Sequence, residues 1–379
     1  MERTIYLDYH ATTPCDPRVI ERMLPFLTED FGNPAAVNSA HGRRAATALE
    51  DARATVAGFL GANPSEVKFT SGATEANNTV IRSFARPGAH VITCAIEHKS
   101  VLEPLARAQR DGARVTVLPV DRAGFVDPDD VREAITPETK LVTIMAANAE
   151  IGTIEPLDLI AAVCRDYGIP FHTDATQAIG KIPFDAAELG CAMLSLSAHK
   201  LYGPKGVGAL VVRKGVRVEP LLVGGGQEKG ARSGTVNVPG AVGLAAAMEI
   251  RRGEMAEEAA RLGVMRDRLR ERIVSEITDV LVNGPREYRL PGNLNVSFRR
   301  VESDALLFAL RRFSLSSGSA CSAGEREPSY VLRAIGLGDD EAMGSIRFGL
   351  GKATTQQDLD LLVEDLKVAV ARLRETAPV

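Results

Sequence analysis

The chain has 379 residues, of which 45% are hydrophobic and 25% are charged. This is ordinary globular composition with enough chain for two domains of roughly 100–200 residues each, so it argues against disorder. The net charge of -4 lacks the basic excess of a dedicated nucleic-acid binder. No apolar run approaches the roughly 20 residues that cross a bilayer, and the start has no secretory pattern. We therefore expect a cytoplasmic protein with no direct nucleic-acid or membrane partner.

The cysteines are scattered singly, without the paired spacing of a zinc site or a disulfide framework. We expect free thiols and no metal site, and a typical free cysteine is a small buried apolar residue. The five are Cys15, Cys94, Cys164, Cys191 and Cys321.

Short β-rich runs alternate with helical stretches between about residues 60 and 215. Continuous apolar strands suit a sheet that is covered on both faces, and a helical segment between Pro156 and Gly168 favours right-handed crossovers between parallel strands. The sequence thus predicts an α/β fold. The expected strands are Val67–Thr70, His90–Ile96, Val115–Leu118, Leu141–Ala146, Ile169–Thr173, Met193–Ser197 and Gly208–Val212.

The second part of the chain has a different pattern. Residues 240–277 are rich in Ala, Glu and Arg, which predicts long helical structure with a possible break near Gly253 and a bridge between two domains. Beyond it we expect a compact α+β domain. Its predicted elements are a strand Leu294–Phe298, a short helix capped by Ser303, a Ser/Gly loop at 316–324, a strand Ser345–Leu350, and a last helix with a capping box of Thr355 and Asp358.

Polar residues follow several of the predicted strands. In open α/β sheets, ligands bind beyond the carboxyl ends of the strands. The turn Thr70–Thr74 offers backbone N–H groups to an anion, although a simple helix cap explains it equally well. His98 is by itself more typical of a core histidine. Asp174, with Gln177 just after it, ends an apolar strand, so we expect a positive group to face its carboxylate.

Lys200 follows the strand Met193–Ser197, where access of solvent is expected to be limited. Most lysines are surface charges. A desolvated lysine at a strand end is suited to Schiff-base chemistry, because its pKa can fall enough to expose a free amine. Together with Asp174, this lysine points to a pyridine cofactor.

At these motifs the sequence resembles the cysteine desulfurases of the NifS/IscS type, which are fold-type I enzymes dependent on pyridoxal 5'-phosphate (PLP). The resemblance runs nearly end to end, from Tyr6–Pro14 to the last helix. Its motifs are TSGATEANN from Thr70, HTDATQAIG from His172, SLSAHKLYGPKG from Ser195, GGGQEKGARSGT from Gly224 and SSGSACSAGEREPSYVLRAIG from Ser316.

The resemblance implies a large PLP-binding domain with a mainly parallel seven-stranded sheet (16–255) and a smaller α+β domain (1–15 and 256–379) that carries a catalytic loop at about 316–328. It implies that L-cysteine is converted to L-alanine. The sulfur is held as a persulfide on Cys321 and is passed to an acceptor protein for iron–sulfur cluster, thio-cofactor or tRNA sulfur assembly.

The resemblance also assigns roles to the cofactor site. Lys200 would carry PLP and move the α-proton, Asp174 would keep the pyridine nitrogen protonated, and His98 would stack on the ring. Gln177 would bind the phenolic oxygen. The phosphate would be held by Ala73, Thr74, Ser197 and His199, with Thr235 contributed by the second subunit of a homodimer.

Two further residues concern the substrate. Cys321 lies in a run of small residues where a core cysteine would not normally be found, and a thiolate on such a tether can reach the sulfur of bound cysteine. Arg347 resembles the arginine that binds the substrate carboxylate through two parallel hydrogen bonds. A surface arginine on a strand is the alternative.

The sequence departs from the family pattern at two places. Ala149 replaces the second of two asparagines, which leaves Asn148 as a candidate contact to cofactor or substrate. Near the start the family's histidine is displaced to His41, to which no role is assigned.

Three other functions remain open from the residues. A selenocysteine lyase or a PLP aminotransferase would use Lys200, Asp174 and Gln177 equally well, but neither needs Cys321. A sulfur-carrier or scaffold-binding module without catalysis would not need Lys200. The sequence does not identify the persulfide acceptor.

Overall fold

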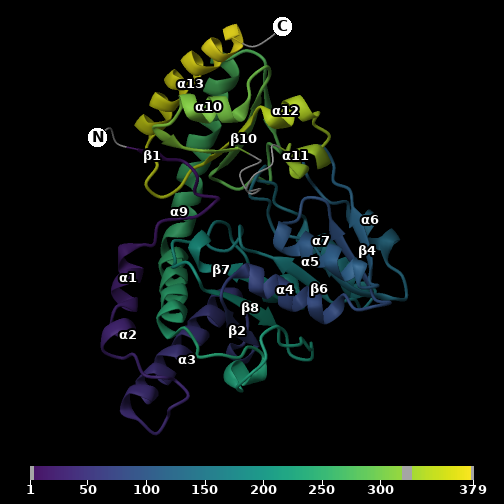
Figure 1. The fold of residues 1–379 in the computed structure, drawn as a ribbon, viewed down its shortest axis with the longest axis vertical. Coiled ribbons are helices and arrows are strands. Elements are labelled where there is room, and N and C mark those ends of the chain that lie inside the picture. The colour runs from purple at the N-terminus through teal and green to yellow at the C-terminus, as the bar shows by residue number, and fades with distance from the viewer. Residues whose placement is uncertain (1–3, 318–326, 377–379) are drawn as a thin grey trace.

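The computed structural model describes residues 4–317 and 327–376. A large sheet and its helices fill the lower part of Figure 1, and a smaller sheet with its own helices lies above, with the long helix α9 (Val238–Glu276) running between them. None of the helices in these two ranges is both long and apolar enough to cross a membrane.

The large sheet has seven strands in the order β2-β8-β7-β6-β5-β3-β4. All neighbouring pairs are parallel except those made by β8, which runs antiparallel to β7 and β2. The predicted α/β fold with a mainly parallel sheet is therefore confirmed. The strands are β2 (Val67–Thr70), β3 (His90–Cys94), β4 (Arg114–Leu118), β5 (Thr139–Thr143), β6 (Phe171–Asp174), β7 (Met193–Ser197) and β8 (Gly208–Val212).

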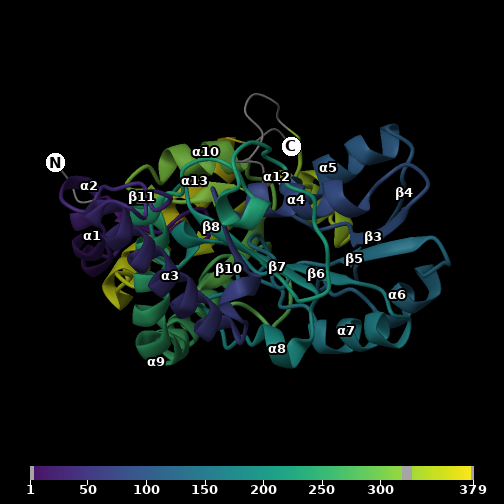
Figure 2. The same ribbon diagram turned by 90° about the horizontal axis from the view of Figure 1, so that it is seen from below.

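Helices cover both faces of this sheet, as the apolar strands require (Figure 2). On one face, α4 (Ala73–Phe84) and α5 (Lys99–Arg110) bury residues such as Val80 and Leu105. On the other face a larger core forms with further helices. These are α1 (Pro17–Met23), α3 (Ala40–Leu60), α6 (Pro128–Ala134), α7 (Leu157–Asp166), α8 (Ala186–Leu189) and the first half of α9.

The smaller sheet is antiparallel, in the order β12-β13-β10-β9. Its apolar face packs against the second half of α9, α10 (Ser303–Ala309) and α13 (Gln356–Thr376), with Phe298 and Phe348 fully buried. The short helices α11 (Tyr330–Ala334) and α12 (Asp339–Met343) lie beside it. The strands are β9 (Val280–Asn283), β10 (Asn293–Phe298), β12 (Ser316–Ser317) and β13 (Ser345–Gly349).

The N-terminal segment belongs to both halves. Strand β1 (Ile5–Tyr6) pairs with β11 (Phe313–Ser314) beside the smaller sheet. The chain then passes through residues 8–16 and enters α1, which packs on α9. Residues 8–16 therefore pass between the two halves of the molecule and contact the groups that lie there.

Several predicted boundaries were wrong. The strands predicted to end at Ile96 and Ala146 end at Cys94 and Thr143, because the following apolar residues are buried in loops beyond the sheet edge rather than in the ladder. The strand predicted as Ile169–Thr173 is Phe171–Asp174, so Asp174 itself is the last strand residue.

Three predictions in the second half need comment. Helix α9 runs through Gly253 without a break, because its two ends are held by separate cores. Ser303 is the first residue of α10 and Glu302 is the N-cap, which makes no side-chain cap, so that prediction was wrong. The capping box of Thr355 and Asp358 is confirmed, since each side chain accepts the other's backbone N–H, at 3.2 and 3.0 Å.

Candidate active site

The lysine predicted to hold the cofactor lies in a short 3-10 turn, η2 (Ala198–Lys200), directly after β7. Its ammonium nitrogen donates to the carbonyl oxygens of His10 at 2.8 Å and Ala11 at 2.5 Å. These carbonyls belong to the segment that passes between the two halves. Lys200 is therefore half-buried at the junction of the large sheet and the N-terminal segment.

Asp174 ends the neighbouring strand β6 and is only 6% exposed. Its two oxygens accept hydrogen bonds from Asn77 Nδ2 at 2.7 Å and from the backbone N–H of Thr176 at 3.0 Å. In the part of the chain that the structure describes, no lysine or arginine forms an ion pair with it. A buried carboxylate without a cationic partner is costly, so the Asp174 carboxylate is suited to a positively charged ligand atom.

His98 is the N-cap of α5, and its Nδ1 accepts the backbone N–H of Ser100 at 3.1 Å. Because Nδ1 is an acceptor, the proton of a neutral ring lies on Nε2. Burial lowers the pKa of His98, with nearby Asp174 opposing the effect and Lys200 adding to it. The imidazole ring of His98 is thus neutral and presents an apolar face close to Asp174 and Lys200.

A chain of hydrogen bonds joins His98 to Asp174. Ser100 Oγ lies 2.8 Å from His98 Nδ1 and accepts from Asn77 Nδ2 at 2.8 Å, and the same Asn77 nitrogen donates to Asp174. Asn77 and Ser100 were not singled out from the sequence. Asn77 stands in the TSGATEANN motif, so its place on the inner face of α4 was the available signal.

The start of α4 is open to an anion. Its N-cap is Gly72, and no side chain caps the first turn, so the simple capping interpretation of this motif is wrong. The backbone here is close to β7 and β8: a Cβ at Gly72 would lie 3.3 Å from Ser197 Oγ, and one at Gly208 would lie 2.7 Å from Gly72 Cα. Ala73, Thr74 and Ser197 therefore border one uncapped helix N-terminus, which attracts negative charge.

His199 lies one residue before Lys200, and its Nδ1 is 3.0 Å from Thr12 Oγ1. Burial and then the neighbouring Lys200 lower its pKa to about 4, so the ring is neutral at physiological pH. It can offer a single N–H to a ligand.

Gln177 is buried beside the N-terminal segment, where its Nε2 donates to the His10 carbonyl at 3.0 Å. Its Oε1 accepts from Lys181 and lies 3.2 Å from His10 Nδ1. The two contacts at Oε1 fix the amide with its Nε2 toward the carbonyl that also holds Lys200. His10 and Lys181 were not predicted as site residues.

Asn148 is 3% exposed, and both ends of its amide are engaged by the protein. Nδ2 donates to the Ile96 carbonyl at 2.9 Å, and Oδ1 accepts the N–H groups of Glu150 at 2.8 Å and Ile151 at 3.0 Å. In this structure Asn148 orders the turn after β5, and because Nδ2 also donates to Met145 Sδ at 3.6 Å, both amide protons already have acceptors within the protein.

Arg347 projects from β13 and forms an ion pair of 2.8 Å with Asp8. Its Nε is buried and has no partner among the described residues. Asp8 is two and three residues before His10 and Ala11, whose carbonyls hold Lys200, so the N-terminal segment brings Arg347 toward the lysine. Thr235 is exposed in the segment before α9, and Cys321 lies outside the described residues.

The chain matches the aminotransferase class-V family over residues 5–362. It is 47% identical over 384 residues to the cysteine desulfurase IscS of Anaeromyxobacter dehalogenans (strain 2CP-C), with 100% of this chain and 95% of that protein covered. Among solved structures, a NifS-like protein gives a TM-score of 0.90 at 38% identity, covering 97% of this chain and 100% of the other. SspA in complex with cysteine gives 0.81 at 37% identity, with 92% and 99% covered.

The chain therefore belongs to the aminotransferase class-V family, and within it to the cysteine desulfurases of the IscS/NifS type. The predicted fold-type I architecture and the predicted activity, removal of sulfur from cysteine, are both confirmed. Within the described residues, no cluster of three or more His, Cys, Asp or Glu side chains is arranged to hold a metal ion.

Proposed function

We propose that this desulfurase holds PLP on Lys200 and collects the sulfur of L-cysteine on Cys321. The observation that carries the cofactor assignment is the buried Asp174 carboxylate, which has no ion-pair partner in the described chain and lies beside the Lys200 turn. PLP, when bound, supplies an aldehyde for amines and a protonated pyridine ring that accepts electrons.

The neighbouring side chains fit this group. Asp174 would hold the pyridinium proton, the neutral face of His98 would pack on the ring, and Gln177 Nε2 would donate to the phenolic oxygen. The uncapped start of α4, with Ala73, Thr74, Ser197 and His199, suits a phosphate. We propose that Thr235 of a second copy completes this phosphate site, which makes the enzyme a homodimer.

Arg347 would bind the substrate carboxylate. Its unpartnered Nε is a donor that a carboxylate can use together with a terminal nitrogen, while Asp8 keeps the guanidinium in place. Asn148 would contribute at most a secondary contact to cofactor or substrate. Once released from the cofactor, the amine of Lys200 would take the proton from the substrate Cα. The carbonyl oxygens that accept its hydrogen bonds would hold it in place.

Cys321 would then act as the nucleophile. Its thiolate attacks the sulfur of the bound cysteine, an S–S bond forms as the Cβ–S bond breaks, and Cβ keeps the electron pair and takes a proton to give alanine. The resulting persulfide goes to an acceptor such as an iron–sulfur scaffold or a sulfur carrier.

We further propose the division into a large domain, 16–255, and a small domain, 1–15 with 256–379, and a cytoplasmic location. The separate apolar cores of the large sheet and of the second sheet support this division in most places, but Val331, Leu332 and Ala342 of α11 and α12 pack into the core of the large sheet. Helix α9 and the N-terminal segment cross the proposed boundary.

Replacing the proposed nucleophile tests the sulfur route. Cys321→Ser is expected to abolish transfer of labelled sulfur from cysteine to the protein and to a thiol acceptor, while the yellow cofactor colour remains. Cys15→Ser, at a half-buried free cysteine, should leave transfer intact.

If Cys321→Ser still released sulfur from cysteine as fully as the native enzyme, the persulfide step would be rejected. A lyase reaction, as in selenide elimination, would then be favoured. A Lys200→Ala protein that still retained the cofactor covalently would reject the cofactor assignment instead.

A further inference from the structure

Tyr202 occupies an unusual position two residues after Lys200. Its backbone is in the left-handed region, with φ of 64°, which costs energy for a residue with a Cβ. Two contacts with the N-terminal segment hold it there: Tyr202 N–H donates to Thr13 Oγ1 at 2.8 Å, and Tyr202 C=O accepts from Asp16 N–H at 2.9 Å. The turn that carries Lys200 is therefore fixed at its far end as well as at the lysine itself.

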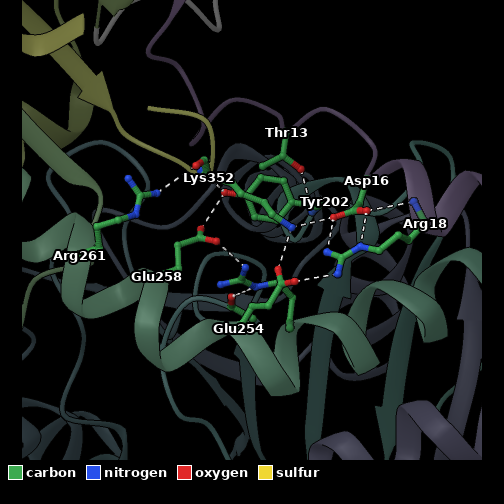
Figure 3. A network of polar contacts seen from close by, with 10 residues as sticks. Thr13, Asp16, Arg18, Tyr202, Glu254, Glu258, Arg261 and Lys352 are labelled. Carbon is green, nitrogen blue, oxygen red and sulfur yellow. Dashed lines mark hydrogen bonds and ion pairs between the residues drawn. The ribbon is translucent and has the colours of Figure 1, made fainter. Parts of the chain in front are cut away.

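The Tyr202 phenol links that turn to two other elements (Figure 3). Its O–H donates to Glu258 of α9 at 2.8 Å, and its oxygen accepts the backbone N–H of Lys352 at 2.8 Å. Lys352 lies five residues beyond Arg347, just after β13 ends. One side chain, 8% exposed, thus connects the lysine turn, the long helix and the strand that carries the proposed carboxylate-binding arginine.

The surrounding groups hold this link rigidly. Arg251, 2% exposed, contacts Glu258 at 2.6 Å, places its guanidinium 5.3 Å from the centre of the Tyr202 ring and donates to the Gly180 carbonyl at 2.8 Å. Arg261 binds the carbonyls of Lys352 at 3.0 Å and Thr354 at 2.8 Å. Both partners of the phenol are therefore fixed in position before any ligand binds.

We infer that Tyr202 is a positioning residue, which sets the placement of Arg347 relative to Lys200 through its bond to the Lys352 main chain. This inference rests on the proposed roles of those two residues. The inference predicts different effects on binding of the carboxylate and of the amine of an amino acid. Loss of the phenol should weaken recognition of the carboxylate of an amino acid, because the end of β13 loses an anchor to the lysine turn, and should leave the amine-binding end of the site unchanged.

The test uses spectral titration of the cofactor-loaded enzyme with two probes that differ in the carboxylate. L-Alanine carries both the amine and the carboxylate, and ethylamine carries the amine only. For Tyr202→Phe we expect the half-saturating concentration of L-alanine to rise about ten-fold, the size of effect expected for the loss of about one hydrogen bond. That of ethylamine should stay within two-fold, and KM for L-cysteine should rise more than kcat falls.

Arg347→Gln distinguishes failure of the inference from failure of the proposed function. It should raise the L-alanine value and not the ethylamine value in the otherwise native enzyme. If it does not, the role of Arg347 is wrong. If it does and Tyr202→Phe leaves both values unchanged, or raises both equally, the positioning role of Tyr202 is overturned.

Two further comparisons separate positioning from simple stability. Lys352→Met removes the ion pairs of Lys352 with Asp16 and Glu254 but keeps its backbone N–H, so it should lower the melting temperature without changing the L-alanine titration. Glu258→Met and Glu258→Gln both remove the charge next to Arg251, but only the amide still accepts from the phenol. L-Alanine binding should be weaker in the first than in the second, and equal values would overturn the inference even if Tyr202→Phe failed to fold.

Discussion

Burial raises the pKa of two glutamates whose side chains are incompletely hydrogen-bonded. Glu155 is 4% exposed, and burial raises its pKa to about 8, with Asp121 adding to the effect. Its Oε2 accepts the N–H of Val126 at 3.0 Å, while Oε1 has no partner among the described residues. Burial likewise raises the pKa of Glu150 to about 7. Both groups bind a proton in the folded protein over a range where the unfolded chain has lost it.

The sign of the effect follows from proton counting. Between the ordinary glutamate value of 4.5 and about 8, the folded state binds more protons at Glu155 than the unfolded state, so stability falls as pH rises. Glu155→Gln keeps an oxygen for Val126 and removes the titration. We expect the variant to gain stability over the native protein across this window, by up to about 1.4 kcal/mol per pH unit.

Urea unfolding at several pH values measures this difference. Glu133→Gln, at an exposed carboxylate of α6, is the control and should shift stability equally at all pH values. Parallel curves for Glu155→Gln and the native protein would contradict the prediction.

At the scale of elements, the ends of secondary structures place the chemistry. One edge of the sheet brings together the carboxyl ends of β6 and β7 and the starts of α4 and α5. This is expected when the crossovers between parallel strands all have the same handedness. The long helix α9, by contrast, carries no proposed site residue and serves to join the two cores. Two glycines inside α9 show how the packing around a glycine decides its effect on the stability of the helix.

Gly253 lies exposed within α9, and an added Cβ there would meet no atom within 4 Å. Gly253→Ala is therefore expected to stabilise the protein by about 1 kcal/mol, the ordinary difference between glycine and alanine in a helix. Thermal or urea unfolding measures the effect.

Gly243 provides the matched comparison in the same helix. A Cβ there would lie 2.6 Å from Met23 Sδ and 2.9 Å from Pro204 Cγ, so Gly243→Ala should destabilise the protein. A loss of stability on changing Gly253 would show that the helix does bend there.

At the scale of the whole molecule, two segments cross between the halves and pass the site. The N-terminal segment contacts Arg347 through Asp8 and Lys200 through His10 and Ala11, and α9 contacts the Lys200 turn through Glu258. Relative movement of the halves would therefore change the distance between the two groups proposed to hold the ends of the substrate. A second copy is proposed to complete the phosphate site from outside.

Thr235→Ala tests the contribution of the second copy. If this hydroxyl reaches the partner's phosphate, the dissociation constant for PLP should rise about ten-fold, the loss of one hydrogen bond to a charged group, with the dimer intact in light scattering. Thr278→Ala, at an exposed threonine beyond the end of α9, should change neither. A monomeric native enzyme with full cofactor affinity would contradict the prediction.

The sequence was a good guide to the parts of the fold that depend on local pattern. Three of the large-sheet strands, Val67–Thr70, Met193–Ser197 and Gly208–Val212, have the predicted bounds because short apolar runs between turn residues leave little choice. Where apolar residues continued into buried loops, as after Cys94 and Thr143, the pattern overran the strand. The helix break at Gly253 and the cap at Ser303 failed because tertiary packing outweighs the preference of one residue.

The candidate site divides in the same way. Sequence motifs alone indicated the family and the activity, which the comparisons confirm, and the resemblance supplied the roles of Lys200, Asp174 and the other proposed cofactor residues, which stay predictions. Only the tertiary structure decided that Asn77 joins His98 to Asp174, that His10 and Lys181 orient Gln177, and that the Tyr202 phenol ties the Lys200 turn to Lys352. Such contacts join residues up to 167 positions apart, and hydrogen bonds between distant segments leave no period or spacing in the sequence from which they could be predicted.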